Sequence, residues 1–246
     1  MRLEGKIAVV TGGASGFGAG IARKFAAEGA SLMIADLNGA AAKKQAAVLG
    51  ARACTADVSN DAEVAAMVAA TLDAYGRIDI LINNAGTTHL PAPLEEVSVA
   101  DFDRVFAVNC KSVYLTAKHL VPLFKAQGSG AILNVASTAG VSPRPRLNWY
   151  NASKGWMNTA TKTMAVELAP VGIRVNAINP VAGETPLLKS FMGEDTPEIR
   201  AKFLATIPIG RFSTPEDMGN AACYLCSDEA SMVTGVCMEV DGGRCI

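Results

Sequence analysis

The segment KIAVVTGGASGFG, residues 6–18, decides the fold of this chain. Residues 7–10 form a short apolar run that predicts a buried strand, and residues 19–29 (AGIARKFAAEG) have the periodicity of a helix. Glycines let a backbone approach a pyrophosphate closely, and a helix amino terminus offers free N–H groups and a favourable dipole. A strand, a glycine-rich turn and a helix start are the context that a dinucleotide-binding site requires.

The glycines of this turn have an uncommon spacing. Gly12, Gly16 and Gly18 follow the pattern G-x-x-x-G-x-G, so a search for G-x-G-x-x-G would miss them, and a glycine-rich turn alone is also compatible with a plain loop. Asp36 favours the nucleotide site, because residues 31–36 (SLMIAD) predict a second buried strand that ends in an acid. Its position is the one expected of a carboxylate that binds ribose hydroxyls.

The remaining chain alternates strand-like apolar runs with helical stretches. This alternation predicts an α/β protein with a doubly wound parallel sheet, a Rossmann fold in one domain over residues 1–246. The expected strands are IAVV (7–10), SLMIA (31–35), 51–54, DILINN (79–84), AILNVAS (131–137), IRVNAI (173–178) and CMEV (237–240). Residues 184–212 interrupt the pattern with glycines, prolines and short amphipathic pieces, and we expect them to form a mobile substrate lid rather than a static surface excursion.

Ser137, Tyr150 and Lys154 together predict a proton-transfer device. Tyrosine and lysine at i and i+4 project from one helix face, so the ammonium can stabilise the phenolate. At ~4 Å and an effective dielectric of ~20, this interaction contributes ~4 kcal/mol, enough to lower a tyrosine pKa by about three units from ~10. Such a tyrosine exchanges protons with an alcohol or ketone. Ser137 follows a predicted strand, where it can hold the same substrate oxygen.

A second Y-x-x-x-K pair in the chain shows that the spacing alone is not sufficient. Tyr114 and Lys118 have the same separation, but residue 101, thirteen positions before Tyr114, is an aspartate rather than a serine. Ser137, in contrast, lies at the carboxyl end of a predicted strand, where ligands of open α/β sheets bind. We therefore interpret the first pair as helix surface.

With these motifs in order, the chain resembles the short-chain dehydrogenase/reductase family from end to end. TGGASGFG is similar to its glycine motif, Asp57-Val58 to its adenine-contacting pair and Asn83-Asn84-Ala85-Gly86 to its NNAG motif. The resemblance implies a catalytic tetrad of Asn109, Ser137, Tyr150 and Lys154. Tyr150 would be the general acid/base, and Ser137 would position the substrate oxygen. Lys154 would lower the tyrosine pKa and bind nicotinamide-ribose hydroxyls, while Asn109 would hold a water in a proton relay. The implied cofactor-binding residues are Gly12, Ser15, Gly16, Phe17, Gly18, Asp36, Asp57, Val58, Asn84, Ala85, Gly86, Tyr150, Lys154, Pro180 and Thr185.

Two segments depart from the family pattern. Family members often have N-P-G after the strand of residues 173–178, whereas this chain has Asn179-Pro180-Val181-Ala182-Gly183, with the glycine two places later. Thr185 keeps its distance from Pro180 and is carried over as a contact to the nicotinamide carboxamide. The loop before Tyr150 contains Arg144 and Arg146, and we hypothesise that one of them recognises an anionic or strongly polar substrate group; surface solvation is the alternative.

Composition argues against several partners and locations. With 22 basic and 23 acidic residues and a net charge of −1, the chain has no basic field for nucleic acid and no polybasic membrane patch. We find no apolar stretch of the ~18 residues that a transmembrane helix needs. We expect a cytoplasmic protein.

Cysteine and histidine positions do not favour a metal site. Cys223 and Cys226 form a C-x-x-C, but residues 219–231 have helical periodicity, which places both thiols on one buried face. His89, just after the NNAG motif, is a candidate to border the substrate pocket, and His119 is expected on a helix surface. Neither histidine has metal-ligand spacing.

The sequence therefore predicts an NAD-dependent oxidoreductase that interconverts a secondary alcohol and a ketone. One alternative is a reductase of 3-oxoacyl thioesters on acyl carrier protein, and another is an inactive family member that binds NAD as a regulatory protein. Apolar helices at 102–126 and 149–169 and the apolar tail at 233–246, together with the resemblance, predict a homotetramer.

Overall fold

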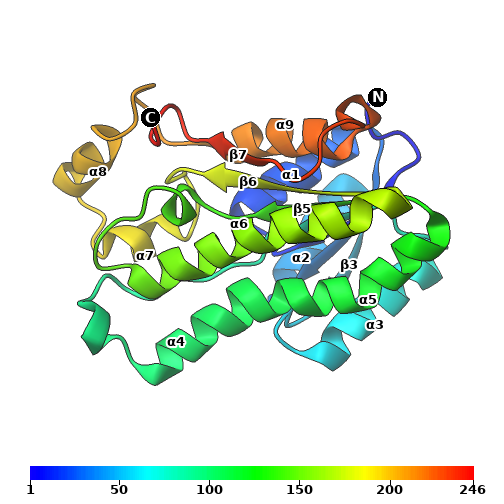
Figure 1. Ribbon diagram of the computed structural model, residues 1–246, viewed down its shortest axis with the longest axis horizontal. Helices are drawn as coiled ribbons and strands as arrows, with labels where there is room; N and C mark the ends of the chain where they lie inside the picture. The colour runs from blue at the N-terminus through cyan, green and yellow to red at the C-terminus, as the bar shows by residue number, and fades with distance from the viewer.

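A seven-stranded parallel sheet forms the centre of the computed structural model, which describes residues 1–246 (Figure 1). The strand order is β3-β2-β1-β4-β5-β6-β7, and every neighbouring pair is parallel. The strands are β1 Ile7–Thr11, β2 Ser31–Asp36, β3 Arg52–Thr55, β4 Ile80–Asn83, β5 Gly130–Val135, β6 Ile173–Pro180 and β7 Cys237–Val240. All seven strands predicted from the sequence are present, and the predicted doubly wound α/β fold is confirmed.

Helices cover both faces of this sheet (Figure 1). Helices α1, α2 and α9 pack on one face, and α3, α5 and α6 pack on the other. The α-helices are α1 Gly16–Ala27, α2 Gly39–Leu49, α3 Asp61–Tyr75, α4 Val99–Phe106, α5 Ser112–Gln127, α6 Asn148–Leu168, α7 Leu188–Met192, α8 Pro197–Leu204 and α9 Pro215–Cys226. None of them is both long and apolar enough to cross a membrane.

Side chains that alternate along each strand contribute to two hydrophobic cores, one on each face of the sheet. In β1, Ala8 and Val10 contact the core under α1 and α9, whereas Val9 between them contacts the core under α3 and α5. Successive side chains of a strand point to opposite faces, so a strand covered on both sides must be apolar throughout. All five residues of β1 are buried, which explains why its sequence shows no polar alternation.

The polypeptide crosses from one half of the sheet to the other between β1 and β4. From β1 the chain proceeds outward to β2 and β3, then returns to β4 on the other side of β1. Ligands of such sheets bind at the carboxyl ends of the strands beside this switch point. The strand ends after Thr11, Asn83 and Val135 meet there.

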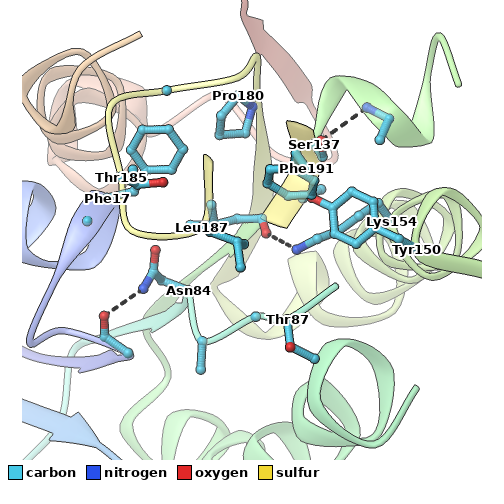
Figure 2. Close-up of a pocket in the computed structure, with 18 of the residues that line it drawn as sticks. Phe17, Asn84, Thr87, Ser137, Tyr150, Lys154, Pro180, Thr185, Leu187 and Phe191 are labelled. Carbon is cyan, nitrogen blue, oxygen red and sulfur yellow. Dashed lines mark hydrogen bonds between the residues drawn. The ribbon is translucent and has the colours of Figure 1, made fainter. Parts of the chain in front are cut away.

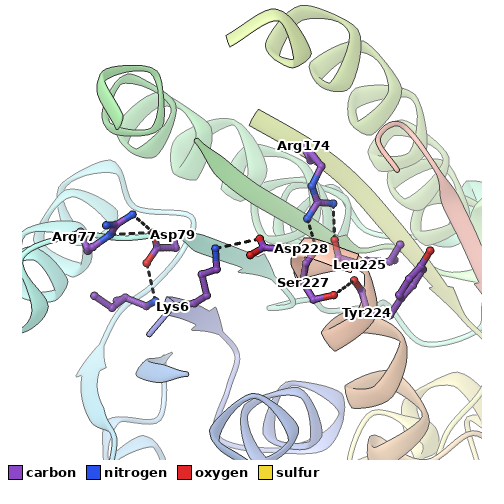
Figure 3. A network of polar contacts seen from close by, with 9 residues as sticks. Lys6, Arg77, Asp79, Arg174, Tyr224, Leu225, Ser227 and Asp228 are labelled. Carbon is purple, nitrogen blue, oxygen red and sulfur yellow. Dashed lines mark hydrogen bonds and ion pairs between the residues drawn. The ribbon is translucent and has the colours of Figure 1, made fainter. Parts of the chain in front are cut away.

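A polar network fixes the opposite end of the sheet (Figure 3). Asp79 Oδ2 accepts from the backbone N–H of Ile7 at 2.9 Å, which ties the start of β1 to the start of β4. Arg174 at the start of β6 donates to the carbonyls of Leu225 and Ser227 at 2.7 and 3.0 Å. These carbonyls end helix α9, where a cation is favourable. The network holds the scaffold together at the end of the sheet away from the carboxyl ends of the strands, where ligands of such sheets bind.

Candidate active site

A cavity of about 580 Å³ opens at the carboxyl ends of the strands. Its lining includes most of the site residues predicted from the sequence. These are Gly12, Ser15, Gly16, Phe17, Asp36, Asp57, Val58, Asn84, Ala85, Gly86, Ser137, Tyr150, Lys154, Pro180 and Thr185. Gly18 and Asn109 lie behind the lining, so the structure brings together all predicted residues but these two on one surface.

The glycine turn presents an uncapped helix end to this cavity. Ser15 precedes α1 but makes no side-chain capping bond, whereas Asn38 and Asn60 cap the next two helices with their side chains. The first N–H groups of α1 therefore lack a side-chain acceptor, and a helix amino terminus in this state suits a phosphate group. Residues 12–18 thus fit the pyrophosphate of a dinucleotide.

Close packing explains two of the glycines. Gly12 has φ +61°, and a Cβ there would lie 2.9 Å from both the Ala85 Cα and the Asn84 Nδ2. A Cβ on Gly18 would collide with the carbonyl of Gly12. Gly18 consequently acts by letting α1 approach the turn, which is why it does not line the cavity. Asn84 completes this arrangement, because its Nδ2 donates to the carbonyls of Thr11 and Gly12 at 2.8 and 3.0 Å.

Two carboxylates lie on the β2–β3 side of the cavity. Asp36 ends β2, and its oxygens accept from the N–H groups of Ala14 at 3.1 Å and Asn38 at 2.9 Å. Asp57 Oδ1 accepts from the N–H and hydroxyl of Ser59 at 2.8 and 2.7 Å. A carboxylate has about four acceptor positions, so Asp36 keeps capacity for the hydroxyls of a ribose. The buried side chain of Val58 adds an apolar surface beside them.

Tyr150, Ser137 and Lys154 converge on the β5 side of the cavity (Figure 2). Ser137 follows β5 and starts a short 3-10 turn, where its Oγ accepts from Ala139 N at 3.1 Å. Tyr150 and Lys154 lie one turn apart near the start of α6, and both are buried. The predicted placement of a strand-end serine beside a helical Tyr–Lys pair is therefore correct.

The expected direction of the tyrosine pKa shift is wrong for the chain by itself. Burial raises the pKa of Tyr150 to about 12, although a hydrogen bond with Ser137 acts in the opposite direction. Burial lowers the pKa of Lys154 to about 8. The ammonium donates to the Val135 carbonyl at 2.8 Å and lies 5.9 Å from the centre of the tyrosine ring. The simple Coulomb argument failed because it ignored the cost of taking both groups out of water.

Asn109 lies in a π-helical turn, Ala107–Lys111, between α4 and α5. One long helix was predicted for residues 102–126, and the π turn divides it. The Asn109 side chain is fully buried and already bonded: Oδ1 accepts from Thr87 N, and Nδ2 donates to Thr87 O and Ser153 Oγ, each at 2.9 Å. Both Nδ2 protons are used, so a water held by residue 109 would have to donate to the free acceptor position of Oδ1 or to the backbone carbonyl. Single π-helical turns within α-helices often occur at functional sites.

The displaced glycine of residues 179–183 has a packing role. A Cβ on Gly183 would lie 2.6 Å from Phe17 Cε1 and 2.7 Å from Ser213 Oγ. Val181, at the position where family members often have glycine, is instead buried with Leu188 and Phe212. Thr185 still reaches the cavity, opposite Gly16 (Figure 2).

The segment predicted as a lid supplies residues that motif analysis missed. Helices α7 and α8 lie in it, and Leu187, Phe191 and Phe203 line the cavity. The ring of Phe191 lies 5.0 Å from that of Tyr150. No motif marks these residues, and only their place in the irregular segment of residues 184–212 could have indicated them.

Of the three other candidate substrate-pocket residues, Arg144, Arg146 and His89, only Arg144 lines the cavity. Arg144 lines the cavity, whereas Arg146 is exposed and outside the lining, with a left-handed backbone at φ +68°. His89 is buried and bonds the Leu90 carbonyl at 2.8 Å, but it does not line the cavity.

The second Tyr–Lys pair lies on the surface, as predicted. Tyr114 is 59% exposed, and Lys118 makes an ion pair with Asp61 at 2.6 Å. His119 contacts the same carboxylate at 2.7 Å. Cys223 and Cys226 are both buried in the core under α9, on one helix face as expected, and burial raises the pKa of Cys226 to about 12.

Comparison with protein families finds one match that spans the site. Residues 12–244 match a family model described as enoyl-(acyl carrier protein) reductase. Among curated proteins, the 4-formylbenzenesulfonate dehydrogenase of Comamonas testosteroni is 49% identical over 99% of both chains. The 3-oxoacyl-[acyl-carrier-protein] reductase of Thermotoga maritima is 39% identical over the whole of both chains.

Solved structures agree with these matches. A 3-ketoacyl-(acyl-carrier-protein) reductase from Brucella melitensis, complexed with NADH, superposes with a TM-score of 0.95 at 50% identity, covering 99% of this chain and 100% of that one. Levodione reductase superposes with a TM-score of 0.95 at 32% identity, covering 99% of each chain.

Proposed function

Because this chain belongs to the short-chain dehydrogenase/reductase family, we propose that it is an NAD(H)-dependent oxidoreductase interconverting a secondary alcohol and a ketone. The observation that carries this proposal is the convergence of Ser137, Tyr150 and Lys154 on one cavity with the uncapped amino terminus of α1. A bound nicotinamide cofactor supplies the hydride acceptor or donor. The residues of the chain supply the proton transfer and the positioning.

Tyr150 is the general acid/base in this proposal. In oxidation its phenolate oxygen takes the alcohol proton as hydride leaves the substrate carbon for the cofactor, and in reduction the tyrosine hydroxyl gives that proton to the carbonyl oxygen. Ser137 donates to the same substrate oxygen, and its contact with Ala139 N fixes the serine side chain. Lys154 holds its ammonium beside the tyrosine. Asn109, in the π turn, binds the backbone N–H of Thr87 and so fixes the segment after β4. Burial keeps water away from the reacting oxygen.

Asp36 sets the cofactor preference in this proposal. A carboxylate ~5 Å from a 2′-phosphate at an effective dielectric of ~20 costs roughly 3 kcal/mol for each pair of unit charges before screening. The cavity lining has no basic side chain on this side: Ser15 and Leu37 are neutral, and the lining cations are Arg104, Arg144 and Lys154. The Brucella reductase is complexed with NADH, and this similarity also favours NAD.

We expect kcat/KM to be ~100-fold or more higher with NAD than with NADP, since each ~1.4 kcal/mol is tenfold. Asp36→Asn should remove most of this difference, chiefly by improving NADP. Measurement of kcat/KM for both cofactors on one substrate decides the matter. Equal values in the unmodified enzyme would mean that Asp36 does not face the ribose.

The substrate screen should begin with ring-bearing alcohols. Relatives include a cis-4-hydroxycyclohexanecarboxylate dehydrogenase and a 7alpha-hydroxysteroid dehydrogenase, 38% and 37% identical. NAD reduction should be assayed with cyclic alcohols, aryl alcohols, hydroxysteroids, sugars and hydroxyacyl thioesters. A cyclic or aryl secondary alcohol should give the highest kcat/KM.

The acyl-thioester reductase is the second candidate, favoured by the names of the Brucella and Thermotoga relatives. It predicts that 3-oxoacyl thioesters on acyl carrier protein are reduced much faster than any free ketone. An inactive NAD-binding regulator would bind cofactor and turn over nothing in the panel. The presence of Ser137, Tyr150 and Lys154 in one cavity argues against the inactive form.

A further inference from the structure

Two arginines without carboxylate partners lie at one end of the cavity. Arg144 lines it from the loop before α6, and Arg244 approaches from the C-terminal tail to donate to Ser142 Oγ at 3.0 Å. Ser142 is itself part of the lining. Neither arginine makes an ion pair, in contrast to Arg104, which pairs with Asp101.

Most of the N–H groups on these two side chains have no protein acceptor. A guanidinium carries five N–H donors, but Arg144 makes one side-chain hydrogen bond, from Nη2 to Thr206 Oγ1 at 2.8 Å. The Nε of Arg244 is buried and has no partner. A buried donor without an acceptor is costly, and an acceptor in the cavity could use the free N–H groups of Arg144.

The carboxylates near this end of the cavity make no ion pair with the arginines. The closest in sequence, Asp241, accepts instead from the backbone N–H groups of Gly243 and Cys245. Burial, and then the neighbouring charge of Arg244, lower the pKa of the Arg144 guanidinium. The two carboxylates of the cavity lining, Asp36 and Asp57, follow β2 and β3, whereas Arg144 lies on the side of β5 and β6. An anion bound to Arg144 would therefore meet no carboxylate of the cavity lining.

Apolar surface separates this end from the reacting groups. Phe191 packs on Tyr150 with ring centres 5.0 Å apart, and the Arg144 guanidinium lies 4.3 Å from the centre of the Phe203 ring. Asn151, next to Tyr150, donates to the Arg144 backbone carbonyl at 2.7 Å and so fixes the loop relative to α6. Phe191 and Phe203 thus offer a substrate ring apolar surface, one beside the acid/base and the other beside Arg144.

We propose that Arg144 and Arg244 bind an oxyanionic group, a carboxylate or sulfonate, at the far end of a ring-bearing alcohol or ketone substrate. This inference rests on the proposed function. Arg144 provides direct contacts from the cavity wall, and Arg244 adds charge from behind Ser142. Arginine suits this task because its planar fork matches the two oxygens of a carboxylate.

A matched pair of secondary alcohols tests the proposal. The pair is 4-(1-hydroxyethyl)benzoate and 4-(1-hydroxyethyl)benzamide, which differ in charge but hardly in shape. The wild-type kcat/KM should favour the benzoate by roughly 30- to 100-fold. Arg144→Met should abolish most of this preference through KM, while Arg144→Lys keeps part of it. Arg244→Met should lower it by about tenfold, and exposed Arg146→Met is the matched control that leaves it unchanged.

Arg144 also contacts Thr206 and Phe203 of the segment over the cavity, so a purely structural role makes a different prediction. In that case Arg144→Met would slow both alcohols equally, and the proposal would be overturned. A wild-type enzyme that oxidised the benzamide as well as the benzoate would also overturn it, although the proposed function would stand.

Binding without turnover separates the two proposals further. Calorimetric titration with 4-acetylbenzoate and 4-acetylbenzamide should show tighter binding of the anion, lost in Arg144→Met. If neither alcohol were oxidised, the wider substrate panel would decide the proposed function, and this titration would still decide the anion site. Equal affinities of the two ligands would overturn it.

Discussion

Tyr150 and Lys154 show how burial and proximity compete at one site. The sequence places the ammonium one helical turn from the phenol, and the structure confirms that placement. Their pKa values nevertheless move in the directions that favour the uncharged forms, to about 12 and about 8. Spacing in the sequence predicts which groups meet, whereas the depth of burial depends on the whole fold.

Lys154 predicts a pH dependence of stability. Its pKa of about 8 in the fold lies below its ordinary value of 10.5, so the buried charge destabilises the native state below pH 8. This cost disappears as the pH rises through the window from 8 to 10.5. Lys154→Met removes the charge and should raise the free energy of unfolding near neutral pH by about 1–3 kcal/mol.

The free energy of unfolding is measured by urea titration of the wild type and of Lys154→Met, both without cofactor. The titrations run from neutral pH to about one unit below the ordinary lysine pKa. The advantage of Lys154→Met should shrink as the pH rises. An advantage that stays constant over this range would show that lost packing or the lost bond to Val135, rather than the charge, sets the difference.

At the scale of elements, strands and their ends were predictable, and the path of the segment after β6 was not. Seven apolar runs corresponded to seven strands. The five inner strands are buried along most of their length, whereas the edge strands β3 and β7 are only partly buried. Asp36 and Ser137 could be located because they follow those runs directly. The roles of Gly183 and Phe191 depend on contacts with Phe17 and Tyr150, which are distant in the sequence. No local pattern encodes such contacts.

Contact between Phe17 and Gly183 should couple the glycine turn to the segment after β6. Gly183→Ala would place a Cβ 2.6 Å from Phe17 Cε1. Such overpacking should lower the free energy of unfolding by roughly 1–3 kcal/mol. Because Phe17 lines the cavity, cofactor affinity should fall as well. Phe17→Leu in the same protein should recover much of both losses.

Thermal unfolding and cofactor titration of the single and double variants measure this coupling. Gly155→Ala is the matched control, since its added Cβ would meet nothing closer than 3.8 Å. Additive effects of Phe17→Leu and Gly183→Ala would mean that the two loops are energetically independent.

For the whole molecule, exposed apolar side chains suggest association. Val99 and Tyr114, on α4 and α5, are 76% and 59% exposed, and Trp156 and Val166 on α6 are 40% and 79% exposed. We propose a homotetramer in which such residues are covered. Light scattering at micromolar concentration should give four times the 25.5 kDa chain mass. Val166→Glu should shift the population to smaller species, and a monomeric wild type would contradict the proposal.

The central claim is that Tyr150 is the acid/base of an NAD-dependent alcohol–ketone interconversion. The most direct test is steady-state turnover of Tyr150→Phe beside Tyr114→Phe on the best alcohol found, with NAD binding followed by titration. Tyr150→Phe should lose at least the ~100-fold typical of a missing general acid/base while still binding NAD, and Tyr114→Phe should be unaffected. Near-full activity of Tyr150→Phe, or loss of activity in Tyr114→Phe instead, would contradict the account.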